Sequence, residues 1–148
     1  LCGNWGSAAD AEHLAAEFIV RLRPKFNRKS VPAISLSSNT SVITACGNDY
    51  SFNKIFTRSL EGLYNKNDVL IAISTSGNSK NIIDVLKFCK KEKINSIGFL
   101  GNNGGAAKKY SKINLIVPSS NTARIQEIHI FLGHFIFESV ENLLFKKK

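Results

Sequence analysis

Short apolar runs alternate with longer amphipathic stretches along the chain, and this alternation is typical of a parallel α/β sheet. The apolar runs predict strands over residues 31–37, 68–74, 95–100 and 112–117. The stretches between them predict helices over residues 40–45, 52–63, 78–91, 106–110 and 122–145. Residues 69–73 are apolar without a break, which indicates a central strand that is covered on both faces.

The first residues have the character of a strand end and the loop that follows it. Residues 1–4 fit the carboxyl end of one more strand. Ser7 is the expected N-cap of a helix that continues to about Arg21. A domain rarely begins at its first binding loop. We therefore expect residues 1–148 to form a single domain whose N-terminal part is missing.

The composition is that of an ordinary soluble domain. The chain has 148 residues, 43% of them hydrophobic and 21% charged. We find no run of roughly 18 to 20 apolar residues that would span a bilayer, and no secretory signal. The expected location is the cytoplasm, with no membrane partner.

Net charge and cysteines restrict the partners further. The net charge is +9, but the lysines are scattered apart from the run at 146–148, and aromatic residues do not interleave with them. This favours a solvated surface or an anionic small substrate, and no nucleic-acid partner is expected. Cys2, Cys46 and Cys89 have no CxxC spacing and are expected to be reduced thiols.

The strongest local signal is the loop ISTSGNS at residues 73–79, between a buried strand and a helix. Hydroxyl groups, a glycine that lets the backbone approach closely and the free N–H groups of the next helix together suit a phosphate. The hydroxyl side chains are Ser74, Thr75, Ser76 and Ser79. The loop lacks the order GxxxxGK[ST] of nucleotide-binding loops. The alternative is an ordinary Ser/Gly-rich connection. The loop GNWGS at residues 3–7 has a similar character, so the two loops could clasp one anion.

Two pairs of polar side chains have helical spacing. His13 and Glu17 stand four residues apart, and Gln126 and His134 stand eight apart, so each pair shares a helix face. Two imidazoles, a carboxylate and an amide oxygen form a set acceptable to zinc. The alternative is a surface or capping interaction. His129 lies roughly 140° around the helix from His134 and should face elsewhere.

Four blocks of sequence carry a resemblance to a known family: CGNWGSAADAEHLAAEF, GNDYSFNKIF, DVLIAISTSGNSKNII and TARIQEIHIFLGH. In order and spacing they resemble the phosphoheptose isomerases of the sugar isomerase (SIS) superfamily. The resemblance implies an α/β three-layer sandwich around a five-stranded parallel sheet, flavodoxin-like, assembled as a homotetramer with active sites between subunits. It also implies conversion of sedoheptulose 7-phosphate to D-glycero-D-manno-heptose 7-phosphate for bacterial surface polysaccharides such as lipopolysaccharide.

The resemblance also implies roles for individual residues. The implied zinc (Zn2+) ligands are His13, Glu17, Gln126 and His134. The implied substrate-binding residues are Asn4, Ser7, Arg21, Asp49, Ser74, Thr75, Ser76, Ser79 and Gln126. We expect Glu17 to transfer the carbon-bound proton through an enediolate, with His134 assisting ring opening or protonating oxygen.

Two departures and two rival functions accompany the resemblance. Trp5 stands where the family usually has glycine, next to the sugar phosphate, and the family's N-terminal helical part is absent. One rival is a non-catalytic adaptor of the same fold that binds the bacterial replication initiator protein. That branch lacks the counterparts of Glu17 and His134. The other rival is a sugar-phosphate-sensing domain of a transcription regulator, but no DNA-binding segment is visible.

Overall fold

The computed structural model describes residues 1–145 and contains one parallel sheet. Its four strands are neighbours in chain order: β1 (Cys2–Gly3), β2 (Val69–Ser74), β3 (Asn95–Gly101) and β4 (Ile113–Val117). Every adjacent pair is parallel. The lysines at 146–148 lie outside the described range.

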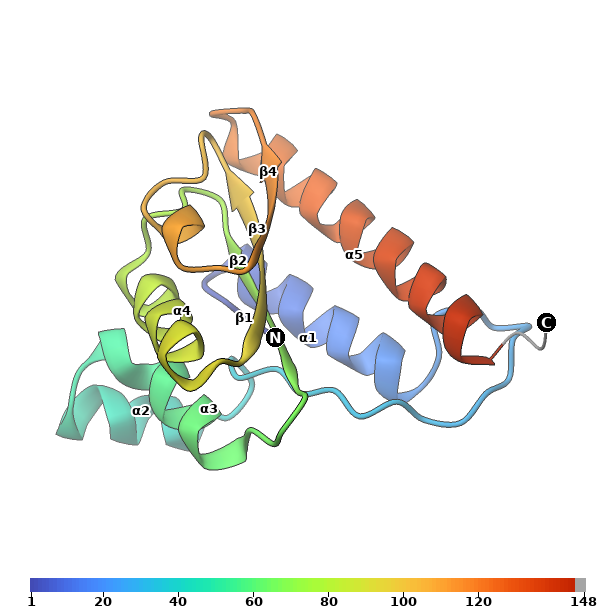
Figure 1. Cartoon of the computed structure of the whole chain (residues 1–148), viewed down its shortest axis with the longest axis horizontal. Coiled ribbons are helices and arrows are strands. Elements are labelled where there is room, and N and C mark those ends of the chain that lie inside the picture. The colour runs from blue at the N-terminus through green and yellow to red at the C-terminus, as the bar shows by residue number, and fades with distance from the viewer. Residues whose placement is uncertain (146–148) are drawn as a thin grey trace.

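Helices cover both faces of this sheet, as Figure 1 shows. On one face lie α1 (Gly6–Ile19) and α5 (Thr122–Phe145), which contact each other. On the other face α3 (Ile55–Leu63) packs against α4 (Lys80–Glu92), with α2 (Thr40–Asp49) outside them. Short 3-10 helices η1 (Phe52–Lys54) and η2 (Ala107–Lys109) complete the fold. The predicted three-layer α/β sandwich is confirmed.

The predicted strand over residues 31–37 is wrong, because these residues run as irregular chain. Two backbone hydrogen bonds still link this segment to the start of the chain: Leu1 N donates to Ile34 O over 2.7 Å, and Leu36 N donates to Leu1 O over 2.8 Å. This is the start of a parallel ladder. Residues 31–37 are not assigned as a strand, so four strands stand in place of the expected five.

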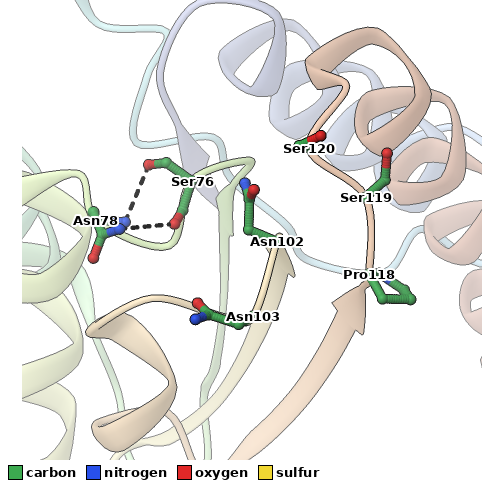
Figure 2. A pocket seen from close by; sticks show the side chains of 7 residues that line it. All are labelled: Ser76, Asn78, Asn102, Asn103, Pro118, Ser119 and Ser120. Atoms are coloured by element: carbon green, nitrogen blue, oxygen red, sulfur yellow. Dashed lines mark hydrogen bonds between the residues drawn. The ribbon is translucent and has the colours of Figure 1, made fainter.

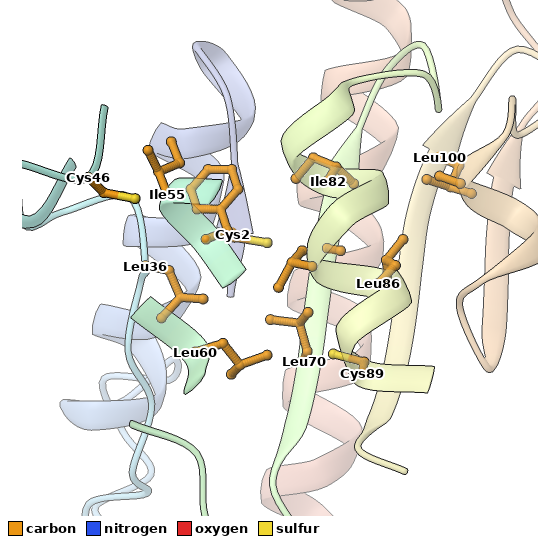
Figure 3. Close-up of a cluster of buried hydrophobic side chains, with 14 residues drawn as sticks. Cys2, Leu36, Cys46, Ile55, Leu60, Leu70, Ile82, Leu86, Cys89 and Leu100 are labelled. Carbon is orange, nitrogen blue, oxygen red and sulfur yellow. The ribbon is translucent and has the colours of Figure 1, made fainter. Parts of the chain in front are cut away.

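Strand β2 divides the core into two parts, as expected for a strand buried on both faces. Leu70 and Ala72 belong to the cluster beneath α3 and α4 that Figure 3 draws. Ile71 and Ile73 belong to the cluster beneath α1 and α5. Successive side chains of a strand point to opposite faces, so one strand anchors both helical layers.

All three cysteines are free and buried, which confirms that they are ordinary core thiols. Burial raises the pKa of Cys2 and of Cys89 to about 12. Both side chains therefore stay protonated and unreactive at neutral pH.

Helix α5 is long and apolar enough, by length and mean hydropathy alone, to cross a membrane, although the sequence argument found no such stretch. One face of the helix packs on the sheet and α1 through Ile125, His129, Gly133 and Phe137. These contacts place one face of α5 on the sheet of a layered α/β domain.

Candidate active site

Helices α1 and α5 lie side by side and bring three polar side chains together (Figure 1). The Nε2 atoms of His13 and His134 are 3.1 Å apart. Glu17 reaches both rings, with Oε1 3.2 Å from His13 Nε2 and Oε2 3.5 Å from His134 Nε2. The α1 pair and His134 therefore lie together between the two helices.

A glycine lets the two helices approach this closely. Gly133 precedes His134, and a Cβ added to it would lie 2.6 Å from Leu14 Cδ1. Leu14 is fully buried, so it has no free space into which it could move. The absence of a side chain at residue 133 therefore sets the distance between His13 and His134.

The three side chains offer donor atoms that suit a metal ion. One ligand atom from each of His13, Glu17 and His134 lies within 4.8 Å of the others. Two imidazole nitrogens that face each other at 3.1 Å cannot both carry a proton without repulsion. Glu17 Oε2 is buried and, within residues 1–145, finds no hydrogen-bond partner. The residues present thus fit a zinc ion.

Asp10 is a member of this site that the sequence reasoning missed. It lies three residues before His13 on the same face of α1, and its Oδ2 is buried without a hydrogen-bond partner among the described residues. Burial raises the pKa of Asp10, against the opposing charges of His13 and His134. The spacing of Asp10, His13 and Glu17 could have revealed it, because positions i, i+3 and i+7 share a helix face.

The second part of the site is a pocket of about 510 Å³ between the two predicted loops. Strands β1 and β2 are parallel neighbours, so their carboxyl ends place the loops together. We call this cavity the phosphate pocket; its polar lining comprises Asn4, Ser7, Ser74, Thr75, Ser79, Thr122 and Gln126. Six of the proposed substrate-binding residues thus meet there.

Three helices begin at the phosphate pocket, and two of them, α1 and α4, have open N-termini, whereas α5 is capped by Asn121, whose Oδ1 accepts from Ala123 N at 3.0 Å. Trp5 at the start of α1 and Ser79 at the start of α4 make no side-chain capping hydrogen bond within the described chain. The predicted N-cap Ser7 is wrong, because α1 begins one residue earlier and Ser7 is buried in its first turn. Free N–H groups and two positive helix ends favour an anion at this point.

Hydrogen bonds fix the shape of the two loops. Asn4 and Asn81 exchange side-chain bonds of 2.9 and 2.8 Å, which tie the first loop to α4. Ser74 Oγ accepts from Gly77 N at 3.1 Å and lies 3.3 Å from Ser79 Oγ. Gly77 has a φ of 64°, a conformation that glycine adopts without strain. The hydroxyl groups are therefore held in place before any ligand binds.

Ser76 lies apart from the other hydroxyl residues of its loop. It lines a different, more open cavity of about 620 Å³, which Figure 2 shows, together with Asn78, Asn102, Asn103, Pro118, Ser119 and Ser120. Its Oγ accepts a bond of 3.1 Å from Asn78 N. The lining carries no ionisable group, so this cavity offers hydroxyl and amide groups only.

The sequence also led to predictions for Arg21, Asp49 and His129. Arg21 lies just beyond the end of α1 and is exposed, and Asp49 is the exposed last residue of α2; neither lines the phosphate pocket. Their substrate roles stay predictions. His129 is fully buried, with its ring centroid 6.0 Å from that of Phe99, so it does face away from His134. Burial lowers the pKa of His129 and keeps it neutral.

Comparison with known proteins places this geometry in a family. A family profile described as SIS domain matches residues 1–101. The phosphoheptose isomerase of Clostridium acetobutylicum is 53% identical over 148 residues, which are 100% of this chain and 74% of that protein.

Two solved structures agree with this match, and each covers 95% of this chain and 74% of the other. The phosphoheptose isomerase of Neisseria gonorrhoeae has a TM-score of 0.87 at 40% identity. The one from Francisella tularensis has a TM-score of 0.89 at 33% identity. The chain therefore belongs to the phosphoheptose isomerase family of SIS domain proteins.

Proposed function

We propose that this chain interconverts sedoheptulose 7-phosphate and D-glycero-D-manno-heptose 7-phosphate. One observation carries the proposal: the cluster of His13, Glu17 and His134 shares its two helices with the pocket that we propose binds the phosphate. Ser7 and Gln126, on those same helices, line the pocket. A sugar whose phosphate lies in the pocket can extend its carbon chain toward the cluster.

The reaction moves one proton between neighbouring carbons and one between their oxygens. We assign the carbon step to Glu17, whose carboxylate takes the proton from C1 of the ketose and returns it to C2. The intermediate is an enediolate. We assign the oxygen step to His134, which passes the proton of O1 to O2. Glu17 Oε2 lies 3.5 Å from His134 Nε2, so one carboxylate and one imidazole can serve adjacent atoms.

We propose that His13, Glu17, His134 and Gln126 hold a zinc ion. A zinc ion would act as a Lewis acid that stabilises negative charge on the enediolate oxygens. Gln126 lies over the first loop, since a Cβ added to Gly6 would collide with its amide. Elemental analysis of protein purified without chelator should find zinc, with lower occupancy in His13→Ala. Full occupancy in the double variant His13→Ala, His134→Ala would exclude this site.

The phosphate is proposed to bind the hydroxyls of Ser74, Thr75 and Ser79 and the open starts of α1 and α4. Ser7 and Asn4 would complete this pocket from the first loop. Ser76 as a further phosphate ligand, and Arg21 and Asp49 as further substrate contacts, remain part of the proposal, although all three lie outside the phosphate pocket in this chain. Ligand binding or a second subunit would have to bring them closer.

The assembly is proposed to be a homotetramer with sites between subunits. Phe131 and Phe135 on α5 are each 62% exposed, and Ile128 on the same helix is 43% exposed. Spacings of three and four residues place the three on one face, and a bare apolar stripe of this kind indicates a protein contact. A compact monomer in sedimentation velocity at micromolar concentration would contradict this assembly. The proposed location is the cytoplasm, and the proposed pathway supplies heptose for surface polysaccharide.

The test of the function is turnover by a matched pair of variants. Glu17→Gln keeps the shape and a ligand oxygen but removes the base, so isomerisation and solvent-deuterium exchange should fall by about 10² to 10⁴. Sugar-phosphate binding should remain. Glu12→Gln, an exposed residue of the same helix, is the control and should keep full activity. Deuterium exchange at the wild-type rate in Glu17→Gln would place the base elsewhere.

The adaptor alternative is not favoured. Its branch lacks the counterparts of Glu17 and His134, whereas both residues are present in this chain and lie within 3.5 Å of each other. Absence of turnover with sedoheptulose 7-phosphate, in the presence and absence of zinc, would reopen that alternative.

A further inference from the structure

Trp5, at the rim of the phosphate pocket, has an unusual backbone. It is the one tryptophan of the chain, its exposed fraction is 94%, and its φ and ψ are 54° and −125°. These angles belong to a region that glycine favours. The loop does use glycine where space is short, because a Cβ on Gly3 would collide with Ser7 O and one on Gly6 with the Gln126 amide. Residue 5, by contrast, carries an indole where the backbone favours glycine.

Contacts within the chain do not account for the indole. The carbonyl of Trp5 accepts bonds from Ala8 N at 2.9 Å and from Ala9 N at 3.3 Å, so the backbone is fixed by the start of α1. A glycine would make both bonds equally well. The ring itself is almost bare and gains little from packing on the chain. A large apolar side chain retained in a strained conformation beside a pocket indicates a function for the side chain.

We propose that the Trp5 indole is a specificity-determining wall of the sugar-phosphate site. Trp5 lines the same pocket as Ser74 and Ser79, so with the phosphate on these hydroxyls the ring would cover the carbon chain attached to it. Its apolar face packs on C–H groups, and its Nε1–H donates to a sugar hydroxyl. Ordering the indole restricts only two torsions, so little entropy is lost on binding. The identity of the ligand rests on the proposed function.

Fluorescence tests this directly, because all tryptophan emission comes from Trp5. An exposed indole emits at long wavelength, and cover by a ligand moves the emission to shorter wavelength. Titration with sedoheptulose 7-phosphate should produce this shift, saturating at the Kd that calorimetry measures. Inorganic phosphate, which fills the pocket without a carbon chain, should leave the emission unchanged. An equal shift with inorganic phosphate would overturn the proposal.

Two variants separate the ring from the fold. Trp5→Gly should raise KM for sedoheptulose 7-phosphate about 5- to 30-fold, the loss typical of a deleted aromatic contact. Inhibition by inorganic phosphate should stay the same. Tm should rise by about 2 to 4 °C, because glycine relieves the backbone. Trp5→Phe keeps a ring and should lose less affinity than Trp5→Gly. A rise in KM accompanied by higher Tm cannot come from unfolding.

The outcomes distinguish this inference from the proposed function. If Trp5→Gly turns over substrate with an unchanged KM, the proposed role of the Trp5 indole is refuted and the isomerase function remains supported. A fluorescence shift on sugar-phosphate binding without turnover supports the proposed role of Trp5 and contradicts the isomerase function. In that case the Kd from calorimetry replaces KM in the comparison of variants. No binding of sugar phosphate overturns both. Short-wavelength emission without ligand that disappears on dilution would place the indole between subunits and also overturn the proposal.

Discussion

The ion pair between Arg28 and Glu141 lies in the interior of the fold. Both side chains are buried, with exposed fractions of 1% and 2%, and Arg28 Nε lies 2.6 Å from Glu141 Oε1. Arg28 also donates to the carbonyls of Glu17 and Phe18, each over 2.8 Å. It therefore joins the last turn of α1, which carries Glu17, to the far end of α5. We predict that Arg28→Met destabilises the protein strongly.

The size of the effect follows from burial. Removing one partner leaves a buried charge without its main counterion, which costs about 3 to 5 kcal/mol. Arg23 Nε lies 3.1 Å from Glu141 Oε2 and still partly neutralises the carboxylate, so we expect a cost near the lower end of this range. For a chain of this length the expected fall in Tm is about 6 to 15 °C. The pair Arg58–Glu61, with exposed fractions of 48% and 50%, is the matched control. Arg58→Met should cost at most about 1 kcal/mol.

Urea unfolding followed by circular dichroism measures the free energy of unfolding of both variants. The protein concentration is held fixed, because assembly makes the apparent stability depend on concentration. A second comparison isolates the cause. Arg28→Met combined with Glu141→Met removes both charges, so part of the lost stability should return, while the two α1 carbonyls remain without their donor. If Arg28→Met costs no more than Arg58→Met, the buried pair does not stabilise the fold and the argument fails.

Three further predictions concern pH, helix packing and the thiols. Burial alone would raise the pKa of Glu141, but hydrogen bonds from Arg28, the Leu22 amide and Arg23 outweigh it and lower the pKa. The stability from this lowered pKa is therefore present above the ordinary value of 4.5 and is lost as pH falls below it, so Glu141→Gln should flatten acid unfolding curves below that pH. Gly133→Ala should separate α1 from α5 and lower metal occupancy and turnover together, whereas Gly62→Ala, with open space around it, should change neither. The buried thiols Cys2 and Cys89 should react with a thiol reagent only after unfolding, as absorbance would show.

Local sequence signals were sufficient for the elements that have continuous patterns. The strands β2, β3 and β4 and the full extent of α5 follow from apolar runs and helical spacing, and the structure confirms them within a residue or so. The two binding loops also followed from sequence, because they come directly after strands of a parallel sheet. Parallel strands end at one edge, which brings such loops together without further information.

The errors arose where a tertiary contact decides the outcome. The apolar run at residues 31–37 has strand composition, but a strand needs a series of ladder hydrogen bonds, and in the described part of the chain this run makes two with Leu1. Ser7 has the composition of an N-cap, but the loop turns at Trp5 and buries Ser7 inside the first helical turn. Asp10 was missed although its spacing from His13 and Glu17 places it on the same helix face, because sequence alone does not show that its Oδ2 is buried.

The distances among His13, Glu17 and His134 depend on contacts at three points along α1. At its start, the Asn4–Asn81 bonds hold the first loop on α4. In its middle, Gly133 admits Leu14 and sets the separation from α5. At its end, Arg28 holds the carbonyl of Glu17. None of these contacts is a chemical part of the reaction, yet each restrains one degree of freedom of the helix: its tilt, its distance from α5 and its rotation near Glu17. Because a base must lie within hydrogen-bond reach of a carbon, displacement at any of the three should reduce turnover, and displacement at Arg28 should reduce stability as well.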